Sequence, residues 1–119
     1  DEPVNRSLYK TLQAKDPAEL QQGTRLYNLM IPADEKDKGT YNYKYEWYML
    51  DNLIVSKAFL KNGKGYTIAP EQVHIFNPPW LMYDHPKAGM KIPNRTYGGD
   101  NYYGGISDHL AIYGTFRLN

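Results

Sequence analysis

Near its carboxyl terminus the chain carries a short polar motif, Gly104-Gly105-Ile106-Ser107-Asp108-His109-Leu110, in which a carboxylate and an imidazole are adjacent. The two glycines supply a flexible backbone, and the apolar residues that follow predict a buried strand. Asp108 and His109 therefore stand where a loop enters a strand, in a position that is held rigidly and is reachable from solvent. Such a pair can bind a metal-linked anion and move protons. A turn with a polar cap is the alternative, since a short motif alone is only a hypothesis.

A second carboxylate, Asp51, lies in the middle of the best strand candidate of the chain, Trp47 to Ser56. Both faces of this stretch are apolar, which predicts a central strand covered on both sides. An ionised carboxylate is costly there unless a charged or hydrogen-bonding group meets it. We expect His109 to be that partner, because it stands at the start of the other strong strand, and such a pair would fix the imidazole tautomer. The alternative is that Asp51 caps a bulge or bonds a nearby backbone amide. Strand alternation would place Asp51 on the face of Trp47, Met49, Leu53 and Val55.

The composition is that of one folded domain with little net charge. The chain has 119 residues, 41% of them hydrophobic, and a formal net charge of +1. These values allow a core and exclude a strongly basic nucleic-acid-binding protein. The 12 tyrosines suit sheets and pocket rims, because the ring can be buried while the hydroxyl stays polar.

Several classes of protein are excluded by what the sequence lacks. The chain has no cysteine, which rules out disulfides, a thiolate nucleophile and a cysteine zinc site. No apolar run reaches the roughly 20 residues of a membrane span, and no signal peptide is visible. We therefore expect a soluble protein whose compartment stays open, an extracytoplasmic location included. The start at Asp1, without Met, suggests a chain that is processed or cut from a longer one.

The elements that must position these residues are short. We expect one helix capped by Asn5 or Ser7 and a second from Pro17 to Gly23. Further strands are expected at 40–43, 66–68, 73–76 and 109–118, with a tight turn at 44–46. Residues 33–39 are expected to form a charged surface loop, and Trp80 to Met82 a hydrophobic plug. Residues 83–103 predict a long irregular loop, and loops of this length are usually functional or disordered.

Together, the stretch 47–56 and the motif 104–110 resemble the endonuclease/exonuclease/phosphatase superfamily, which has the deoxyribonuclease I-like fold. That family carries an apolar strand with a central Asp, and later a Ser-Asp-His-Leu motif that opens the last strand. Arg95-Thr96-Tyr97 and Tyr103-Gly104-Gly105 resemble a bacterial branch of it, and Asp1-Glu2-Pro3 resembles the end of that branch's Gly-Asp-Phe-Asn-Asp-x-Pro motif. The resemblance runs over residues 1–119 and covers about the carboxyl-terminal half of the family domain.

The resemblance implies an α+β fold, namely half of a four-layer α/β sandwich with one mostly antiparallel sheet and one or two short helices. Without the partner sheet, the inner face of this sheet would leave a large apolar surface exposed. We therefore expect the chain to pair with the missing amino-terminal half or to self-associate through that face.

The resemblance also implies a metal-dependent phosphoesterase that hydrolyses phosphodiesters or phosphomonoesters of a phosphorylated substrate or nucleic acid. His109 would contact the scissile phosphate as an acid, a base or a transition-state stabiliser, and Asp51 would orient it. Asp108 would act near a Mg²⁺ or Mn²⁺ ion or the attacking water. The family's metal-binding Glu and Asp-x-Asn pair belong to the absent half, so we expect this chain alone to be inactive.

Four residues are candidates for substrate binding: Arg95, Asn52, Tyr97 and Tyr103. The Arg95 guanidinium can grip a phosphate with two hydrogen bonds, or it can pin its loop by bonding backbone carbonyls. Tyr97 and Tyr103 can stack on a base or sugar, or can pack the loop against the sheet. Asn52 occupies the position after the strand Asp, where the family usually has His, Arg or Tyr.

Two other classes of function stay open. One is a tyrosine-rich module that binds glycans or peptides, and the other is a catalytically silent member of the family that acts as a scaffold. The remaining titratable side chains favour neither class, because Asp84 and Asp100 lie in polar segments where carboxylates are usually solvated. His74 and His85 are expected to be structural or surface residues, since nothing nearby completes a ligand set.

Overall fold

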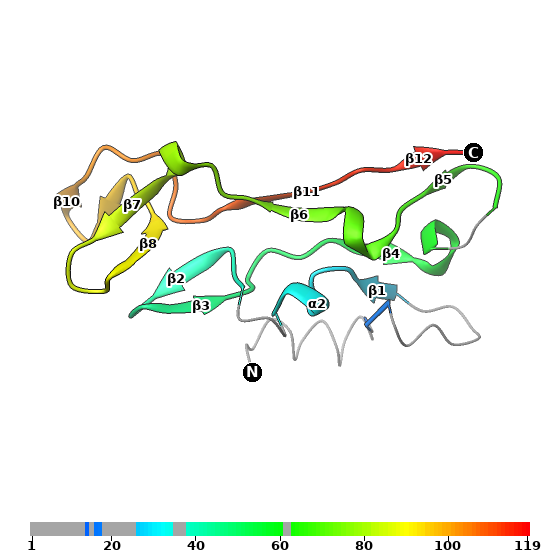
Figure 1. Ribbon diagram of the computed structural model, residues 1–119, viewed down its shortest axis with the longest axis horizontal. Helices are drawn as coiled ribbons and strands as arrows, with labels where there is room; N and C mark the ends of the chain where they lie inside the picture. The colour runs from blue at the N-terminus through cyan, green and yellow to red at the C-terminus, as the bar shows by residue number, and fades with distance from the viewer. Residues whose placement is uncertain (1–13, 15, 18–25, 35–37, 61–62) are drawn as a thin grey trace.

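The structure, a computed structural model, describes residues 14, 16–17, 26–34, 38–60 and 63–119, and in this part the chain is mostly strand with one short α-helix (Figure 1). The helix is α2 (Ile31–Asp34), and three 3-10 helices are η2 (Lys57–Leu60), η3 (Pro70–Gln72) and η4 (Pro79–Leu81). The strands are β1 (Leu26–Asn28), β2 (Tyr41–Tyr43), β3 (Glu46–Tyr48), β4 (Ile54–Ser56), β5 (Tyr66–Thr67), β6 (Val73–Phe76), β7 (Met82–His85), β8 (Met90–Pro93), β9 (Tyr97–Gly98), β10 (Asn101–Tyr102), β11 (Ala111–Gly114) and β12 (Arg117–Leu118).

All the described strand pairs are antiparallel, as the sequence predicts, but hydrogen bonding divides them into small two-stranded sheets rather than one sheet. The pairs are β1–β4, β2–β3, β5–β12, β6–β11, β7–β8 and β9–β10. The β6–β11 ribbon runs between the two ends of an elongated molecule of 48 × 30 × 23 Å (Figure 1). The hairpins β7–β8 and β9–β10 lie at one end of this ribbon, and the pair β5–β12 lies at the other.

The prediction of one continuous strand from Trp47 to Ser56 is wrong. The chain forms β3 and β4, and Asp51 lies at a bend between them. Local bonds to side chains replace ladder pairing in this segment, because the Asp51 N–H donates to Thr40 Oγ1 (3.2 Å) and Asn52 Nδ2 donates to the Leu50 carbonyl (2.9 Å). Strand alternation therefore does not decide which way the Asp51 side chain points.

Two other predictions about the strands are also corrected. The expected strand 109–118 is divided into β11 and β12, and His109 takes part only in an isolated antiparallel bridge with Tyr41. The expected irregular loop 83–103 contains the paired strands β7–β8 and β9–β10. Gly89 (φ 61°) and Gly99 (φ 60°) supply the left-handed backbone that their turns require. Pro86, Gly89 and Gly99 thus lie in hairpin turns, whereas Pro93 and Gly98 lie within the strands β8 and β9.

Several smaller elements follow the sequence. β2 and β6 form at 41–43 and 73–76, and β5 covers most of 66–68. The tight turn is confirmed at Lys44 and Tyr45, with Glu46 already in β3. The helix predicted from Asn5 or Ser7 and most of the one from Pro17 to Gly23 lie outside the described residues. Trp80 does not form a buried plug, because 63% of it is exposed.

The core is small and lies between β1, β4 and the segments that follow them. Tyr27, Leu29, Val55 and Ile68 form its buried cluster, with Leu53, Leu60 and Val73 packed against it. Large aromatic side chains remain exposed elsewhere, as on the ribbon β6–β11, where Phe76 and Tyr113 lie on one face. No described helix has the length and apolar character needed to cross a membrane.

Candidate active site

The structure brings Asp51 and His109 into direct contact, although 58 positions separate them in sequence. Asp51 Oδ2 lies 2.7 Å from His109 Nδ1, and the side chains are 38% and 37% exposed. An ionised carboxylate only accepts hydrogen bonds, so Nδ1 carries the ring hydrogen in this pair. Nε2, the other ring nitrogen, is thereby left to act on a ligand. The contact predicted from the sequence is present, and we call this pair the dyad.

Thr40 connects the segments that carry the two members of the dyad. Its side chain is fully buried, and its Oγ1 accepts the hydrogen bond from the Asp51 N–H. Its carbonyl accepts a hydrogen bond from the Leu110 N–H (2.7 Å), and its own N–H donates to the Tyr48 carbonyl (3.0 Å). One buried residue thus fixes the bend at Asp51 and the backbone next to His109. Sequence reasoning missed Thr40, because only the tertiary fold brings its partners together.

The segment after the bend is held by a pair of asparagines. The Asn52 Oδ1 accepts a hydrogen bond from Asn28 Nδ2 (2.7 Å), while its Nδ2 donates to the Leu50 carbonyl. Asn28 is buried, and its Oδ1 accepts from the Met30 N–H (3.1 Å). Both ends of the Asn52 amide are therefore engaged within the protein. These two hydrogen bonds hold the Asn52 side chain in place, and its expected contact with substrate stays a prediction.

His109 is held from two further sides. The backbone N–H of His109 donates to Ser107 Oγ (3.0 Å), and this hydrogen bond shapes the turn of the Ser-Asp-His motif. The ring of Tyr41 lies 5.0 Å from the His109 ring, centre to centre, at an interplanar angle of 33°. Tyr41 is thus a wall of the site that sequence reasoning did not identify.

Asp108, the expected metal ligand, does not form a metal site with the residues that the structure describes. Its side chain is exposed and has no hydrogen-bond or ion-pair partner among them. Divalent cations such as Mg²⁺ need several oxygen ligands, yet no cluster of three acidic, His or Cys side chains occurs within the described ranges. Asp108 can therefore supply one ligand at most to a metal that other residues complete.

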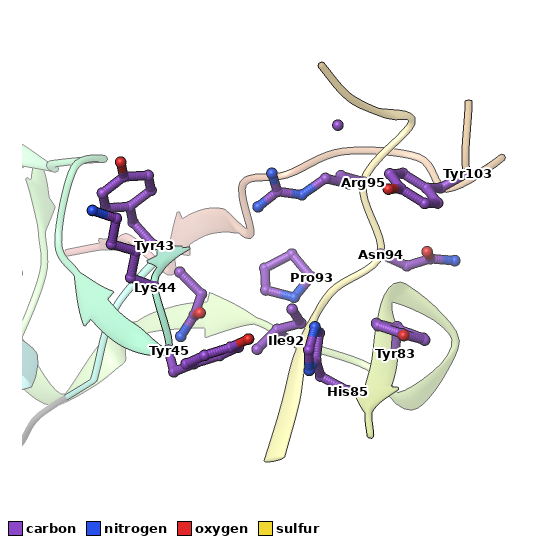
Figure 2. Close-up of a pocket in the computed structure, with 12 residues that line it drawn as sticks. Tyr43, Lys44, Tyr45, Tyr83, His85, Ile92, Pro93, Asn94, Arg95 and Tyr103 are labelled. Atoms are coloured by element: carbon purple, nitrogen blue, oxygen red, sulfur yellow. The ribbon is translucent and has the colours of Figure 1, made fainter. Parts of the chain in front are cut away.

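A cleft of about 660 Å³ lies beside the dyad and takes in two of the four expected substrate-binding residues, Arg95 and Tyr103 (Figure 2). We call it the tyrosine cleft. Three segments form it, namely the hairpin β2–β3, the hairpin β7–β8 and the chain from Asn94 to Tyr103. Its lining consists of Asn42, Tyr43, Lys44, Tyr45, Tyr83, His85, Ile92, Pro93, Asn94, Arg95, Gly98 and Tyr103. Tyr97 lies outside it, with its ring 5.2 Å from that of Tyr102.

Backbone contacts connect the cleft to the dyad. Asn42 in the cleft follows Tyr41, which pairs with His109 in the isolated bridge. On the other side, the Gly105 N–H donates to the Arg95 carbonyl (3.2 Å), and Thr96 Oγ1 donates to the Gly105 carbonyl (2.8 Å). A Cβ at Gly105 would overlap the Asn94 carbonyl, so only glycine allows this approach. The two sites are therefore neighbours along the same two segments.

The other acidic and imidazole side chains have separate surroundings. Asp84 forms an exposed ion pair with Lys91 (2.9 Å), and the ring of His74 lies 5.2 Å from that of Tyr113. His85 Nδ1 accepts hydrogen bonds from the backbone N–H groups of Lys87 and Ala88, a structural role that agrees with the sequence expectation. Its ring also lines the tyrosine cleft, which the sequence did not reveal.

The model of the Endonuclease/Exonuclease/phosphatase family matches residues 1–117 of the chain. The chain therefore belongs to this family, as the resemblance implied. Membership supports phosphoesterase or nuclease activity in general, usually with divalent metals. Neither the curated proteins nor the solved structures contain a match to this chain.

Proposed function

We propose that this chain supplies the Asp-His half of the active site of a metal-dependent phosphoesterase that hydrolyses phosphodiesters or phosphomonoesters. The observation that carries the proposal is the hydrogen bond of 2.7 Å between Asp51 and His109. The pair combines a fixed tautomer with a partly exposed imidazole side chain, and both suit general acid-base chemistry. Family membership makes a phosphoester the reactive group.

In the proposed reaction a water oxygen attacks phosphorus, and the bond to the ester oxygen breaks. His109 Nε2 either takes the proton of the attacking water, while solvent protonates the leaving oxygen, or gives a proton to the leaving oxygen, while the proton of the water passes to solvent; in its protonated form it stabilises charge on the phosphoryl oxygens. Asp51 holds the ring through Nδ1 and balances the positive charge when both nitrogens carry hydrogen. Thr40 and Asn52 keep Asp51 at its bend. Arg95 and Tyr103 bind the substrate next to the dyad.

The proposal includes a Mg²⁺ or Mn²⁺ ion, with Asp108 as one ligand. Such an ion polarises a phosphoryl oxygen when bound. Because the described residues do not complete its coordination, the remaining ligands must come from outside them. We propose that these are the Glu and the Asp-x-Asn pair of an amino-terminal half, and that residues 1–119 form the carboxyl-terminal portion of the domain.

The exposed aromatic side chains support this division of the domain. His74, Phe76 and Tyr113 share one face of the β6–β11 ribbon, and the ring of Trp80 lies 6.0 Å from that of Phe76. Such a face is more apolar than solvent-exposed surfaces usually are. We propose that the missing half covers it as the second layer of the sandwich, and that the separate chain self-associates there. Light scattering of the pure chain tests this, since a monodisperse monomer at high concentration would contradict it.

The decisive experiment measures hydrolysis by the complete protein on a panel of phosphodiesters and phosphomonoesters, with Mg²⁺ and with a chelator. We expect metal-dependent release of product that His109→Asn lowers by about 10²–10⁴-fold. The separate chain should be inactive on the same panel. Full activity of the His109→Asn protein would reject the proposed role of the dyad, and absence of activity on every substrate would favour a silent scaffold.

A further inference from the structure

We propose that the part of the tyrosine cleft between the two hairpins β2–β3 and β7–β8 binds an acidic oligosaccharide, that is, a short sugar chain that carries carboxylates. We call this part the hairpin side, and its lining includes Asn42, Lys44, Tyr45, Tyr83 and His85. The inference goes beyond the proposed function, because it requires no reaction at the dyad. It does not use the third segment of the cleft, which carries Arg95 and Tyr103.

One side chain of the hairpin side is buried and lacks a hydrogen-bond partner. Asn42, in β2, is 4% exposed, and its Nδ2 meets no acceptor among the residues that the structure describes. A buried amide N–H that stays unpaired is costly, so folded proteins seldom keep one. Because Asn42 lines the cleft, a ligand oxygen that enters there would accept this hydrogen bond.

The aromatic rings of the hairpin side offer separate apolar faces to a ligand. Tyr45, His85 and Tyr83 lie in a row along the cleft (Figure 2), and the two tyrosines are 49% and 43% exposed. The His85 ring lies 5.1 Å from that of Tyr45 and 5.7 Å from that of Tyr83, at interplanar angles of 62° and 81°. Neighbouring rings are therefore not parallel and form no slot for one flat ring. Each can instead receive the C–H groups on one face of a sugar, because the face of an aromatic ring is negative.

The charged and directed groups of the hairpin side are donors. Lys44 has no carboxylate partner in the described part of the chain, and its Nζ lies 5.3 Å from the centre of the Tyr43 ring. His85 Nδ1 accepts two backbone hydrogen bonds, so Nε2 carries the ring hydrogen. No acidic residue lines the cleft. A ligand with more acceptors than donors fits this lining, and carboxylates on a sugar chain supply them with a charge opposite to that of Lys44.

The backbone of the β2–β3 turn indicates that Lys44 and Tyr45 serve more than the turn. The two residues have φ values of 49° and 72°, in the left-handed region that disfavours residues with side chains. A two-residue hairpin of this conformation prefers Asn-Gly. Lys-Tyr is therefore a poor choice for the turn, although its cation and its ring both line the cleft. Strain at such positions is typical of residues that serve a binding site.

The size of the cleft suits a short chain. Its volume of about 660 Å³ lies in the range of small-molecule sites, roughly 300–1,000 Å³. Sugar rings are rigid, so little conformational freedom is lost when they bind to rings that are already exposed.

The test is a glycan array probed with the complete protein, followed by calorimetry on the strongest-binding member. The array holds uronate-containing, sialylated and neutral oligosaccharides. We expect hits among the acidic chains, and binding about tenfold weaker or more when the carboxylates of the strongest hit are reduced to alcohols. An array without hits, or with hits among neutral chains alone, would overturn the proposal, and so would equal binding of the reduced chain. Equal binding of tetraglutamate, which has carboxylates but no sugar ring, would also overturn it.

Two variants locate the site. Lys44→Asn with Tyr45→Gly removes the cation and one ring and leaves the sequence that the turn prefers, so that folding is retained. Asn42→Leu replaces the unpaired amide by an apolar group of similar size. We expect each variant to weaken binding of the array hit about tenfold or more. Unchanged binding in both would overturn the proposal.

The matched control is Lys64→Asn with Tyr66→Thr, which removes an exposed cation and an exposed ring outside the cleft. Binding by this variant should stay within about twofold of the original. A loss as large as that of the cleft variants would show that the sugar chain binds through general surface charge and aromatic rings, and would overturn the assignment to the cleft.

The unfolding temperature separates a binding role of Asn42 from a structural one. An unpaired buried amide does not stabilise the fold, so Asn42→Leu should unfold at the same temperature as the original protein or above it. A lower unfolding temperature with full binding would overturn the role assigned to Asn42. If this variant does not fold, the result for Lys44→Asn with Tyr45→Gly decides the test.

The dyad variant shows that the two proposals stand or fall separately. His109→Asn should lose hydrolysis and keep binding of the array hit, because His109 does not line the cleft. If this variant keeps full hydrolysis while the cleft variants lose binding, the proposed function fails and the sugar site remains. If it loses hydrolysis while the cleft variants bind normally, the sugar site alone fails.

Discussion

The dyad and the tyrosine cleft are neighbours in the structure, but they are held in place by different means. In the dyad, a buried threonine fixes both backbones, and each functional side chain already has a partner. In the cleft, two hairpins and one loop carry exposed rings that contact one another, and cations that have no carboxylate partner among the described residues. The difference suggests that the dyad is preorganised for chemistry, whereas the cleft leaves its contacts to be made by a ligand.

The largest effect is expected at the carboxylate of the dyad. Asp51→Asn in the complete protein keeps the shape of the side chain but removes the charge that holds the His109 tautomer. We expect kcat to fall by about 10²-fold or more. Asp84→Asn is the matched control, because Asp84 is an exposed carboxylate in a surface ion pair. A steady-state assay that gives equal rates for the two variants would contradict the role assigned to Asp51.

The next effect concerns how Thr40 positions the dyad. Thr40→Val keeps the volume but removes the Oγ1 that accepts the Asp51 N–H. We expect the free energy of unfolding to fall by about 1–3 kcal/mol, as for a donor that loses its partner, and kcat to fall with it. Thr40→Ser retains the hydroxyl and should restore the rate. Denaturant titration and kinetics of the two variants check this, and a fully active Thr40→Val protein would show that the bend holds without the hydroxyl.

A third prediction concerns the connection between the two regions. Gly105→Ala places a Cβ against the Asn94 carbonyl, so the two backbones must separate. We expect a loss of about 1–3 kcal/mol in the free energy of unfolding, with hydrolysis weakened as well. Gly63→Ala is the control, since a Cβ there would meet no atom within 4 Å. Thermal unfolding should separate the two variants clearly.

The smallest effect is expected at the β2–β3 turn, where a substitution should raise the free energy of unfolding instead of lowering it. Replacing Lys44 and Tyr45 by Asn and Gly removes side chains from two positions of positive φ. We expect the free energy of unfolding to rise by about 1 kcal/mol. The dyad should be unaffected by this local change. A drop in the unfolding temperature would show that the Tyr45 ring contributes more to packing against His85 than the turn conformation costs.

The sequence predicted one long-range contact and the family of this protein better than its strands. The Ser-Asp-His motif, the central Asp51 and the apolar stretch around it were sufficient to predict the dyad contact and the family. The argument from strand alternation was nevertheless wrong, because Asp51 lies at a bend. The sequence does not reveal the hairpins between Met82 and Tyr102, since glycines and prolines also indicate a loop, whereas here they lie in turns or, as Pro93 and Gly98 do, in strands.

By itself, the sequence determined which side chains are available and which short segments pair or turn, because those properties depend on residues close together in the chain. Only the tertiary structure decided that Thr40 connects Asp51 to Leu110, that Asn52 is turned toward Asn28, and that Lys44 faces the same cleft as Arg95. These contacts join residues far apart in sequence. They depend on how strands pair across the fold, and local propensity does not encode that pairing.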